Sequence, residues 1–155
     1  MTAALRPIAV ATVLDVLRTV RDPEIPTVSI VDLGIVERID VGEDLIRVEL
    51  LPTFVGCPAL DLIRADVEAA LAPFGRPVEA EFTWRVPWTS DRISPQGRQR
   101  LAASGFAPPA DPRDVRCPYC ESPNVAMDNL FGPTLCRSLF YCRACRHPFE
   151  AFKPI

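Results

Sequence analysis

Apolar positions recur at helical spacing in some stretches of the chain and alternate with polar positions in others. From Ile8 to Val20 the pattern predicts an amphipathic helix. Its apolar stripe consists of Val10, Val13, Leu14, Leu17 and Val20. Because the residue before a proline avoids the helical region, Asp22-Pro23 ends this helix, and an irregular segment continues to Gly34.

Two strands follow, Ile35–Val41 and Leu45–Leu51, with the short turn Gly42–Asp44 between them. A second helix should begin near Cys57-Pro58, because proline is well tolerated at the first helical position, and it should stop at Pro73 and Gly75.

The run Val78–Val86 predicts a third, strongly amphipathic strand. Its apolar face would consist of Val78, Ala80, Phe82, Trp84 and Val86. Ser94-Pro95 is typical of a helix start and Gly105 of a helix end, so a short helix reaching Ala103 completes the series.

This order of elements predicts an α+β domain over residues 1–107, with a small sheet of about three strands and helices packed on it. Residues 108–112 are rich in proline and should form a stiff linker. From Asp111 onward, 45 residues hold five of the six cysteines but few aliphatic side chains. A module of this size rarely folds without a staple, so residues 113–155 should depend on a metal.

The cysteines of this module form two C-x-x-C knuckles, Cys117/Cys120 and Cys142/Cys145. Four thiolates at such spacing make a closed tetrahedral zinc site, and the segments around residues 125–130, 135–141 and 147–152 can supply the strands of a zinc ribbon. A closed site leaves no position for substrate or water, so the zinc is expected to be structural.

The other metal-binding side chains of the module have several interpretations. Cys136 could replace a knuckle cysteine, join an iron–sulfur site or pack as a small hydrophobe. His147, the only histidine, lies two residues after Cys145 and is expected to face solvent or contact a ligand rather than bind the ion itself.

Composition and charge exclude some classes of function. The 155 residues carry a net charge of −3, with 15 acidic and 11 basic side chains before Asp111, which argues against nucleic acid as a partner. No apolar run reaches the about 20 residues that span a membrane, and a signal-peptide pattern is missing, so the cytoplasm is the expected compartment.

Two further groups could carry chemistry. Cys57 stands where a strand gives way to a helix, and a thiol at a helix N-terminus is stabilised as the thiolate; a buried, inert cysteine is the alternative. Thr53 could donate a hydroxyl to sulfur or metal there. Asp22 and Glu24 flank Pro23 and could either bind a metal or cap a turn.

These same motifs carry a resemblance to a known family. Asp22-Pro23-Glu24-Ile25-Pro26, the run Ser29–Val36, the run Thr53–Pro58 and Pro87-Trp88 appear in the order found in the metal–sulfur cluster assembly family, which includes MIP-eighteen-like and SufT-like domains. The resemblance implies that Cys57 is the reactive thiol in iron–sulfur trafficking, with Asp22, Glu24 and Thr53 around it. It also implies a transient iron–sulfur cluster in addition to the structural zinc.

With the ribbon included, the whole chain resembles the accessory proteins encoded with bacterial phenylacetyl-CoA epoxidase. This implies a maturation factor for the iron or iron–sulfur centres of that enzyme, with its oxygenase or reductase subunits as partners and no catalytic activity of its own. The alternatives are a zinc-ribbon scaffold in the same complex, or a thiol enzyme, although Cys57 has neither a nearby C-x-x-C partner nor a histidine base. The sequence does not decide whether the protein is a monomer or a homodimer.

Overall fold

The computed structural model describes residues 6–53 and 57–155. The chain divides into two compact units. The first comprises Met1–Pro52 and Pro58–Pro87, and the second comprises Thr53–Cys57 and Trp88–Ile155.

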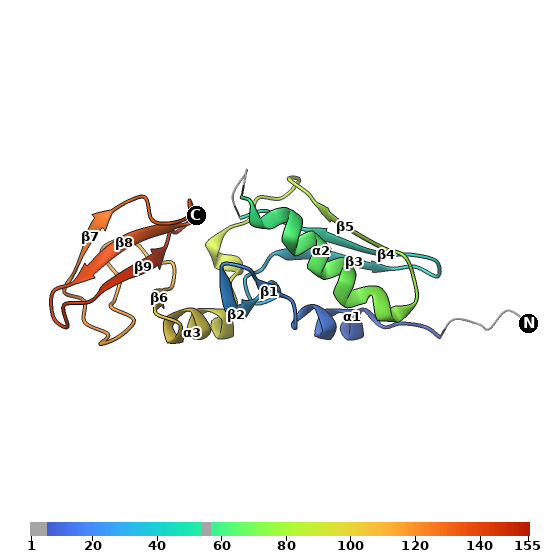
Figure 1. The fold of residues 1–155 in the computed structure, drawn as a ribbon, viewed down its shortest axis with the longest axis horizontal. Coiled ribbons are helices and arrows are strands. Elements are labelled where there is room, and N and C mark those ends of the chain that lie inside the picture. Colours follow the sequence, from blue (N-terminus) through green and yellow to red (C-terminus); the bar gives the residue numbers. More distant parts are fainter. Residues whose placement is uncertain (1–5, 54–56) are drawn as a thin grey trace, which may run out of the picture. The chain divides into compact units, whose positions relative to one another are not determined.

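A three-stranded sheet forms the centre of the first unit (Figure 1). Its strands are β3 (Val36–Val41), β4 (Ile46–Leu50) and β5 (Val78–Phe82), in the order β3-β4-β5. β3 and β4 are antiparallel, whereas β4 and β5 are parallel. A parallel pair needs a crossover, and α2 (Ala59–Leu71) lies in the connection between β4 and β5. The short 3-10 turn Ala72–Phe74 and Gly75, at φ 72°, end that helix.

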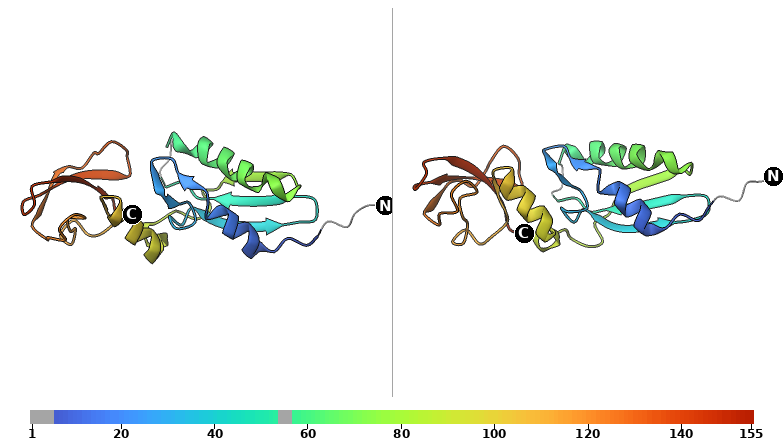
Figure 2. Two further views of the ribbon diagram at one scale, coloured as in Figure 1. Left: turned by 60° about the horizontal axis from the view of Figure 1, so that its bottom comes forward. Right: turned by 90° about the horizontal axis from the view of Figure 1, so that it is seen from below.

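The two faces of this sheet differ in chemistry. Ile46, Val48 and Leu50 of β4 are fully buried, together with side chains of α1 (Val10–Leu17) and α2. The helices contact one another as well as the sheet, and α2 runs along it (Figure 2). The opposite face is charged: Arg47 of β4 stands between Asp40 and Glu79 and pairs with Glu79 at 3.0 Å. The sheet is therefore covered by helices on one face only.

A small hairpin follows α1. β1 (Arg21–Asp22) pairs with β2 (Ile25–Ser29) across a turn at Pro23-Glu24. The backbone N–H of Ile30 donates to the carbonyl of Val20 at 3.0 Å. Val20 is thus buried by this hairpin rather than by a continuation of the helix.

The second unit contains the ribbon and the segment that leads into it. A 3-10 turn (Ser90–Arg92) precedes α3 (Pro95–Ala103), whose first turn is capped by Ser94 Oγ accepting the N–H of Gly97 at 2.9 Å. The sheet consists of β6 (Phe106–Ala107), β7 (Val125–Asn129), β8 (Arg137–Cys142) and β9 (Pro148–Phe152). Its order is β6-β9-β8-β7, with β6 parallel to β9.

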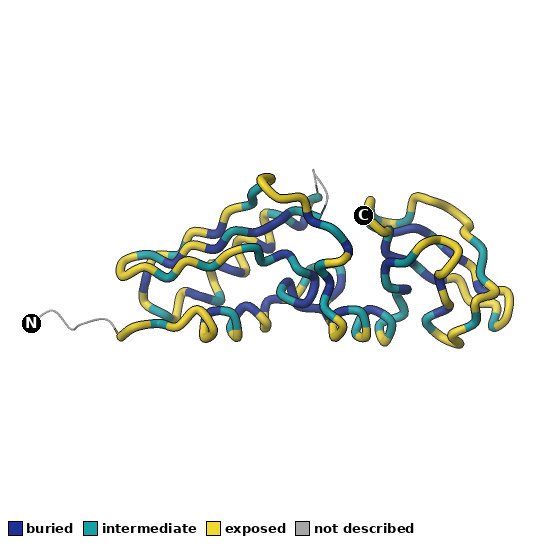
Figure 3. The backbone as a smooth tube through the Cα atoms, turned by 180° about the vertical axis from the view of Figure 1, so that it is seen from behind, coloured by how far each residue is buried: buried dark blue, intermediate teal, exposed yellow. Residues whose placement is uncertain are grey.

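The ribbon has a compact core of its own (Figure 3). Phe140 and Phe149 stack with ring centroids 5.6 Å apart, and Cys117, Cys142 and Ala151 are buried beside them. Arg137 is almost fully buried as well, and its guanidinium pairs with Glu150 at 2.6 Å. Burial of an arginine is tolerated because the charge is paired.

The α+β class with a C-terminal ribbon was predicted from the sequence and is confirmed. Three local predictions are wrong. The first helix ends at Leu17, the segment after it forms a hairpin, and the third strand ends at Phe82. Trp84 and Val86, expected on a buried face, are 62% and 41% exposed.

The proline-rich segment 108–112 behaves differently from a plain linker. Pro109 is buried, and its carbonyl accepts a hydrogen bond from the guanidinium of Arg98 at 3.1 Å. β6 joins the ribbon sheet, and the second compact unit, apart from Thr53–Cys57, runs from Trp88, so it includes residues before the predicted module boundary at residue 113. Among the described residues, no helix is long and apolar enough to cross a membrane.

Candidate metal centre and thiol site

The two knuckles bring four sulfur atoms together. Cys117 and Cys120 lie in the turn before β7, Cys142 ends β8, and Cys145 lies in the turn before β9. The Sγ atoms of Cys117 and Cys145 are 3.6 Å apart, as are those of Cys120 and Cys142, and all four lie within 4.8 Å of one another. An ion with four sulfur ligands at about 2.3 Å in a tetrahedron separates them by about 3.8 Å. The donor set therefore fits one tetrahedral ion.

The two knuckles have the same backbone geometry. In the first, the N–H of Glu121 donates to the carbonyl of Cys117 at 2.8 Å; in the second, the N–H of Arg146 donates to that of Cys142 at 2.9 Å. Both donors take left-handed conformations, with φ of 60° and 64°. This conformation favours glycine, which stands at neither position, so no sequence signal pointed to these two residues.

Hydrogen bonds favour the thiolate form at one of the four sulfurs and outweigh the burial that opposes it. Cys142 is fully buried, and its Sγ accepts the backbone N–H of Cys145 at 3.5 Å. This contact and a second one from the N–H of Ala144 lower the pKa of Cys142 to about 6. The same N–H groups would stabilise the negative charge of a metal-bound thiolate.

The remaining candidates of the module lie outside this cluster. The Sγ of Cys136 is 3.1 Å from Thr134 Oγ1, and this thiol is half-buried. His147 is exposed and packs its ring against Tyr119, with centroids 5.4 Å apart. Within the described residues, the group of potential metal ligands consists of the four knuckle cysteines alone.

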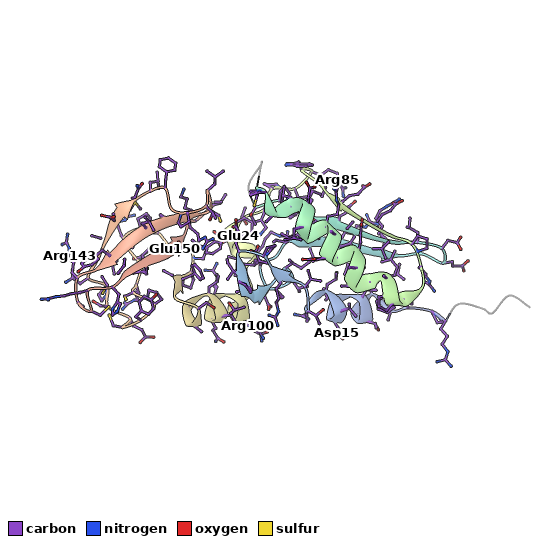
Figure 4. The ribbon with its side chains drawn as sticks, viewed as in Figure 1. Asp15, Glu24, Arg85, Arg100, Arg143 and Glu150 are labelled. Atoms are coloured by element: carbon purple, nitrogen blue, oxygen red, sulfur yellow. The ribbon has the colours of Figure 1, made fainter. Side chains whose placement is uncertain are left out.

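Asp22 and Glu24 stand at the tip of the β1–β2 hairpin. Glu24 is labelled in Figure 4. The Oδ1 of Asp22 accepts the backbone N–H groups of Glu24 and Ile25 at 2.8 and 3.2 Å. Aspartate before proline at the first position of a turn commonly makes these bonds. The capping interpretation of Asp22 is therefore confirmed, and one of its carboxylate oxygens is engaged in the turn.

Thr53 and Cys57 lie between β4 and α2, and both are half-buried. Cys57 lies two residues before Ala59 and is not in a disulfide, and Pro58 is the N-cap of α2 rather than its first residue. The intervening part of the motif, residues 54–56, lies outside the described residues. Thr53 and Cys57 belong to the second compact unit and Asp22 and Glu24 to the first, so a pocket shared by all four stays a prediction.

Sequence families match both halves of the chain. Residues 10–82 match the family described as iron–sulfur cluster assembly protein, and residues 103–153 match the PaaD zinc beta ribbon domain. A Bacillus anthracis domain of unknown function (DUF59) has a crystal structure that aligns with a TM-score of 0.55 at 29% identity, covering 59% of this chain and 89% of that one. The fold and the cysteine cluster thus define a class of protein in which an iron–sulfur assembly domain precedes a zinc ribbon.

Two relatives narrow this class. Over 85 residues the chain is 38% identical to the Fe-S protein maturation auxiliary factor YitW of Bacillus subtilis, covering 53% of this chain and 82% of that protein. It is also 35% identical to an Escherichia coli K12 protein provisionally named as a subunit of 1,2-phenylacetyl-CoA epoxidase, covering 99% of this chain and 98% of that protein. The chain belongs to the PaaD family, which is the family of this epoxidase subunit. These relatives support an accessory role related to iron–sulfur assembly.

Proposed function

We propose that this chain is a maturation factor that helps to assemble the iron or iron–sulfur centres of a phenylacetyl-CoA 1,2-epoxidase. One observation carries the proposal: the chain matches the Escherichia coli epoxidase subunit from end to end, while its first half matches factors named for Fe–S protein maturation. A protein built in this way is suited to preparing an enzyme complex rather than to performing the oxidation.

In this proposal the ribbon holds one structural zinc on Cys117, Cys120, Cys142 and Cys145. The sulfur spacing supports a single ion over a cluster, because a cluster distributes its thiolates over several irons. Four protein ligands leave no open coordination position, so the metal stabilises the fold and takes no part in a reaction.

The trafficking step is assigned to Cys57, with Thr53, Asp22 and Glu24 around it. Cys57 would bind iron or a cluster as a thiolate and release it when a thiolate of the client replaces it, without a change of oxidation state. Its position before α2 supports this role, because the N-terminus of a helix stabilises negative charge on sulfur.

The oxidation itself is assigned to other subunits. A carboxylate-bridged di-iron site needs several glutamate and histidine ligands on facing helices, and the one histidine of this chain lies in the ribbon. The clients are therefore the oxygenase or the reductase of the epoxidase. We expect the purified protein alone not to oxidise phenylacetyl-CoA.

The test is to produce the epoxidase with this protein, without it, and with its Cys57→Ser and Cys136→Ser variants. Iron, acid-labile sulfide and epoxidation rate are then measured per enzyme. We expect low metal content and activity without the protein and with Cys57→Ser, and normal values with Cys136→Ser, the matched control. Full metal content and activity without the protein would refute maturation. If the epoxidase is inactive without this protein, and the Cys57→Ser variant restores its activity as well as the unaltered protein does, the scaffold alternative is favoured.

A further inference from the structure

The connection between β7 and β8 exposes large apolar side chains. Leu130, Phe131 and Leu135 are 50%, 65% and 56% exposed. They lie in one loop, residues 130–136, named here the ribbon tip, which joins the labelled strands β7 and β8 (Figure 1). Single exposed apolar residues are common, but three in one loop are typical of an interaction surface.

Hydrogen bonds hold the ribbon tip in one conformation. The N–H of Phe131 donates to Asn129 Oδ1 at 2.9 Å, and that of Gly132 donates to the carbonyl of Arg137, also at 2.9 Å. Lys153, the only lysine of the chain, donates to the carbonyl of Leu135 at 2.9 Å. Its Nζ also lies 5.0 Å from the centre of the Phe131 ring. The tip thus presents apolar side chains in a fixed conformation beside a cation. Binding would therefore cost little conformational entropy.

The first unit contains a groove of complementary character. It lies between the β1–β2 hairpin and α2 and has a volume of about 430 Å³. Its apolar lining consists of Val20, Pro23, Pro26, Leu62 and Ala70. Leu62 is 50% exposed, so the groove opens to solvent along α2.

The charges of the groove and the tip are also complementary. Asp22 and the exposed Asp66 line the groove, and the one cation among its described lining residues, Arg21, donates to the carbonyl of Thr27. The first unit as a whole carries 14 acidic and eight basic side chains, a net charge of −6. The second carries six acidic and nine basic, a net charge of +3, or +1 with four thiolates and a zinc ion. Opposite net charges favour contact between unlike units of two chains.

We propose that the ribbon tip of one copy inserts into the groove of a second copy, with Phe131 against Leu62 and Lys153 beside Asp66. The full surface of one aromatic side chain is about 150–250 Å². From their exposed fractions, the three tip side chains together expose about 300 Å². The groove offers less accessible surface than the tip, so one insertion, with both surfaces counted, buries about 400 Å². Two reciprocal insertions in a two-fold symmetric dimer bury about 800 Å², which stays below the about 1,200 Å² of specific interfaces, so the dimer is weak, with a Kd on the order of 100 µM.

The test is sedimentation of the zinc-loaded full chain from about 1 to about 500 µM. We expect the mass to rise from 17.1 kDa towards twice that value, and Phe131→Ala and Leu62→Glu each to weaken the dimer more than tenfold. Trp84→Ala is the matched control, because this side chain is 62% exposed and does not line the groove, and it should change nothing. Asp66→Lys and Lys153→Glu should each weaken association several-fold, and the double variant should restore it.

Circular dichroism and zinc content establish that each variant is folded. A protein that stays monomeric at about 500 µM overturns the proposal. This result is also the one expected if the tip binds within its own chain. A dimer insensitive to both Phe131→Ala and Leu62→Glu overturns it as well, as does weakening by Trp84→Ala to the same extent. The inference is independent of the maturation role, since it is read from mass alone.

Discussion

Cys117 and Cys145 belong to different knuckles and stand 28 positions apart, yet their Sγ atoms lie 3.6 Å from each other. Such an approach of sulfurs without a covalent bond is favourable when a cation lies between them. The four strands of the ribbon, the aromatic pair at its centre and the two knuckle turns all converge on this arrangement.

Removal of the metal should therefore unfold the ribbon. We expect one zinc per chain, and loss of native structure over residues 113–155 on treatment with a strong chelator, because metal binding and folding are coupled in such modules. The first unit has its own buried core and should stay folded. Amide hydrogen exchange measures both units in one experiment. Acid should have the same effect as the chelator, since protons compete for the thiolates. Simultaneous loss of protection in both units would contradict this prediction.

The left-handed residues of the knuckles provide a stability test. Arg146→Gly should stabilise the zinc-loaded protein by about 0.5–1 kcal/mol, because a side chain in this conformation costs about 1–2 kcal/mol and glycine avoids part of that cost. Arg143 lies in the same turn at negative φ, so Arg143→Gly should destabilise by about 0.5–1 kcal/mol. Thermal unfolding of the two variants should give shifts of opposite sign, and equal shifts would disprove the argument.

The buried ion pair of the ribbon should contribute strongly to stability. Arg137→Ala leaves Glu150 half-buried without its guanidinium and removes the hydrogen bond to Thr134 Oγ1. We expect a loss of about 3 kcal/mol in the free energy of unfolding. Arg113→Ala removes an exposed pair with Asp111 and should cost less than about 1 kcal/mol. Chemical denaturation of both variants checks the difference, and similar losses would show that burial is not decisive.

The reactivity of the thiols separates Cys57 from Cys136. With the knuckle sulfurs protected by metal, we expect a maleimide or iodoacetamide to label Cys57 first near neutral pH, because the N-terminus of α2 favours its thiolate. Cys136 is equally half-buried and so serves as an internal control. Mass spectrometry of digests over time gives both rates. Labelling of Cys57 no faster than of Cys136 would support the inert, packed cysteine.

The sequence was sufficient to predict the features that depend on local spacing. The spacing within each knuckle, the cap at Ser94 and the hairpin of β3 and β4 follow from residues within a few positions of one another. The exposure of Trp84 depends on where a strand distant in the sequence ends. The N–H of Thr83 donates to the carbonyl of Leu50, where β4 ends, so the alternating residues beyond it have no strand to pair with. An alternating pattern shows where a strand can form and not whether its neighbour continues.

The candidate site shows the same division. The left-handed conformations of Glu121 and Arg146 could not be predicted, because neither residue is a glycine. For Asp22, the sequence alone allowed either a turn cap or a metal ligand. The strand Phe106–Ala107 has two residues, and its register, Phe106 opposite Glu150, is fixed by a partner 44 positions away. A pairing of that range is invisible to any local pattern.

The short strand β6 also determines where the ribbon can be separated from the rest of the chain. A ribbon transplanted onto another protein at the proline run would leave behind one edge of its own sheet, together with the arginine that hydrogen-bonds the carbonyl of Pro109. The continuous part of the second unit begins at Trp88, well before the first knuckle, and Thr53–Cys57 is the other part of that unit. Recombination between relatives should therefore be tolerated best near Pro87, where the compact units divide, and poorly at the prolines that look like a natural joint.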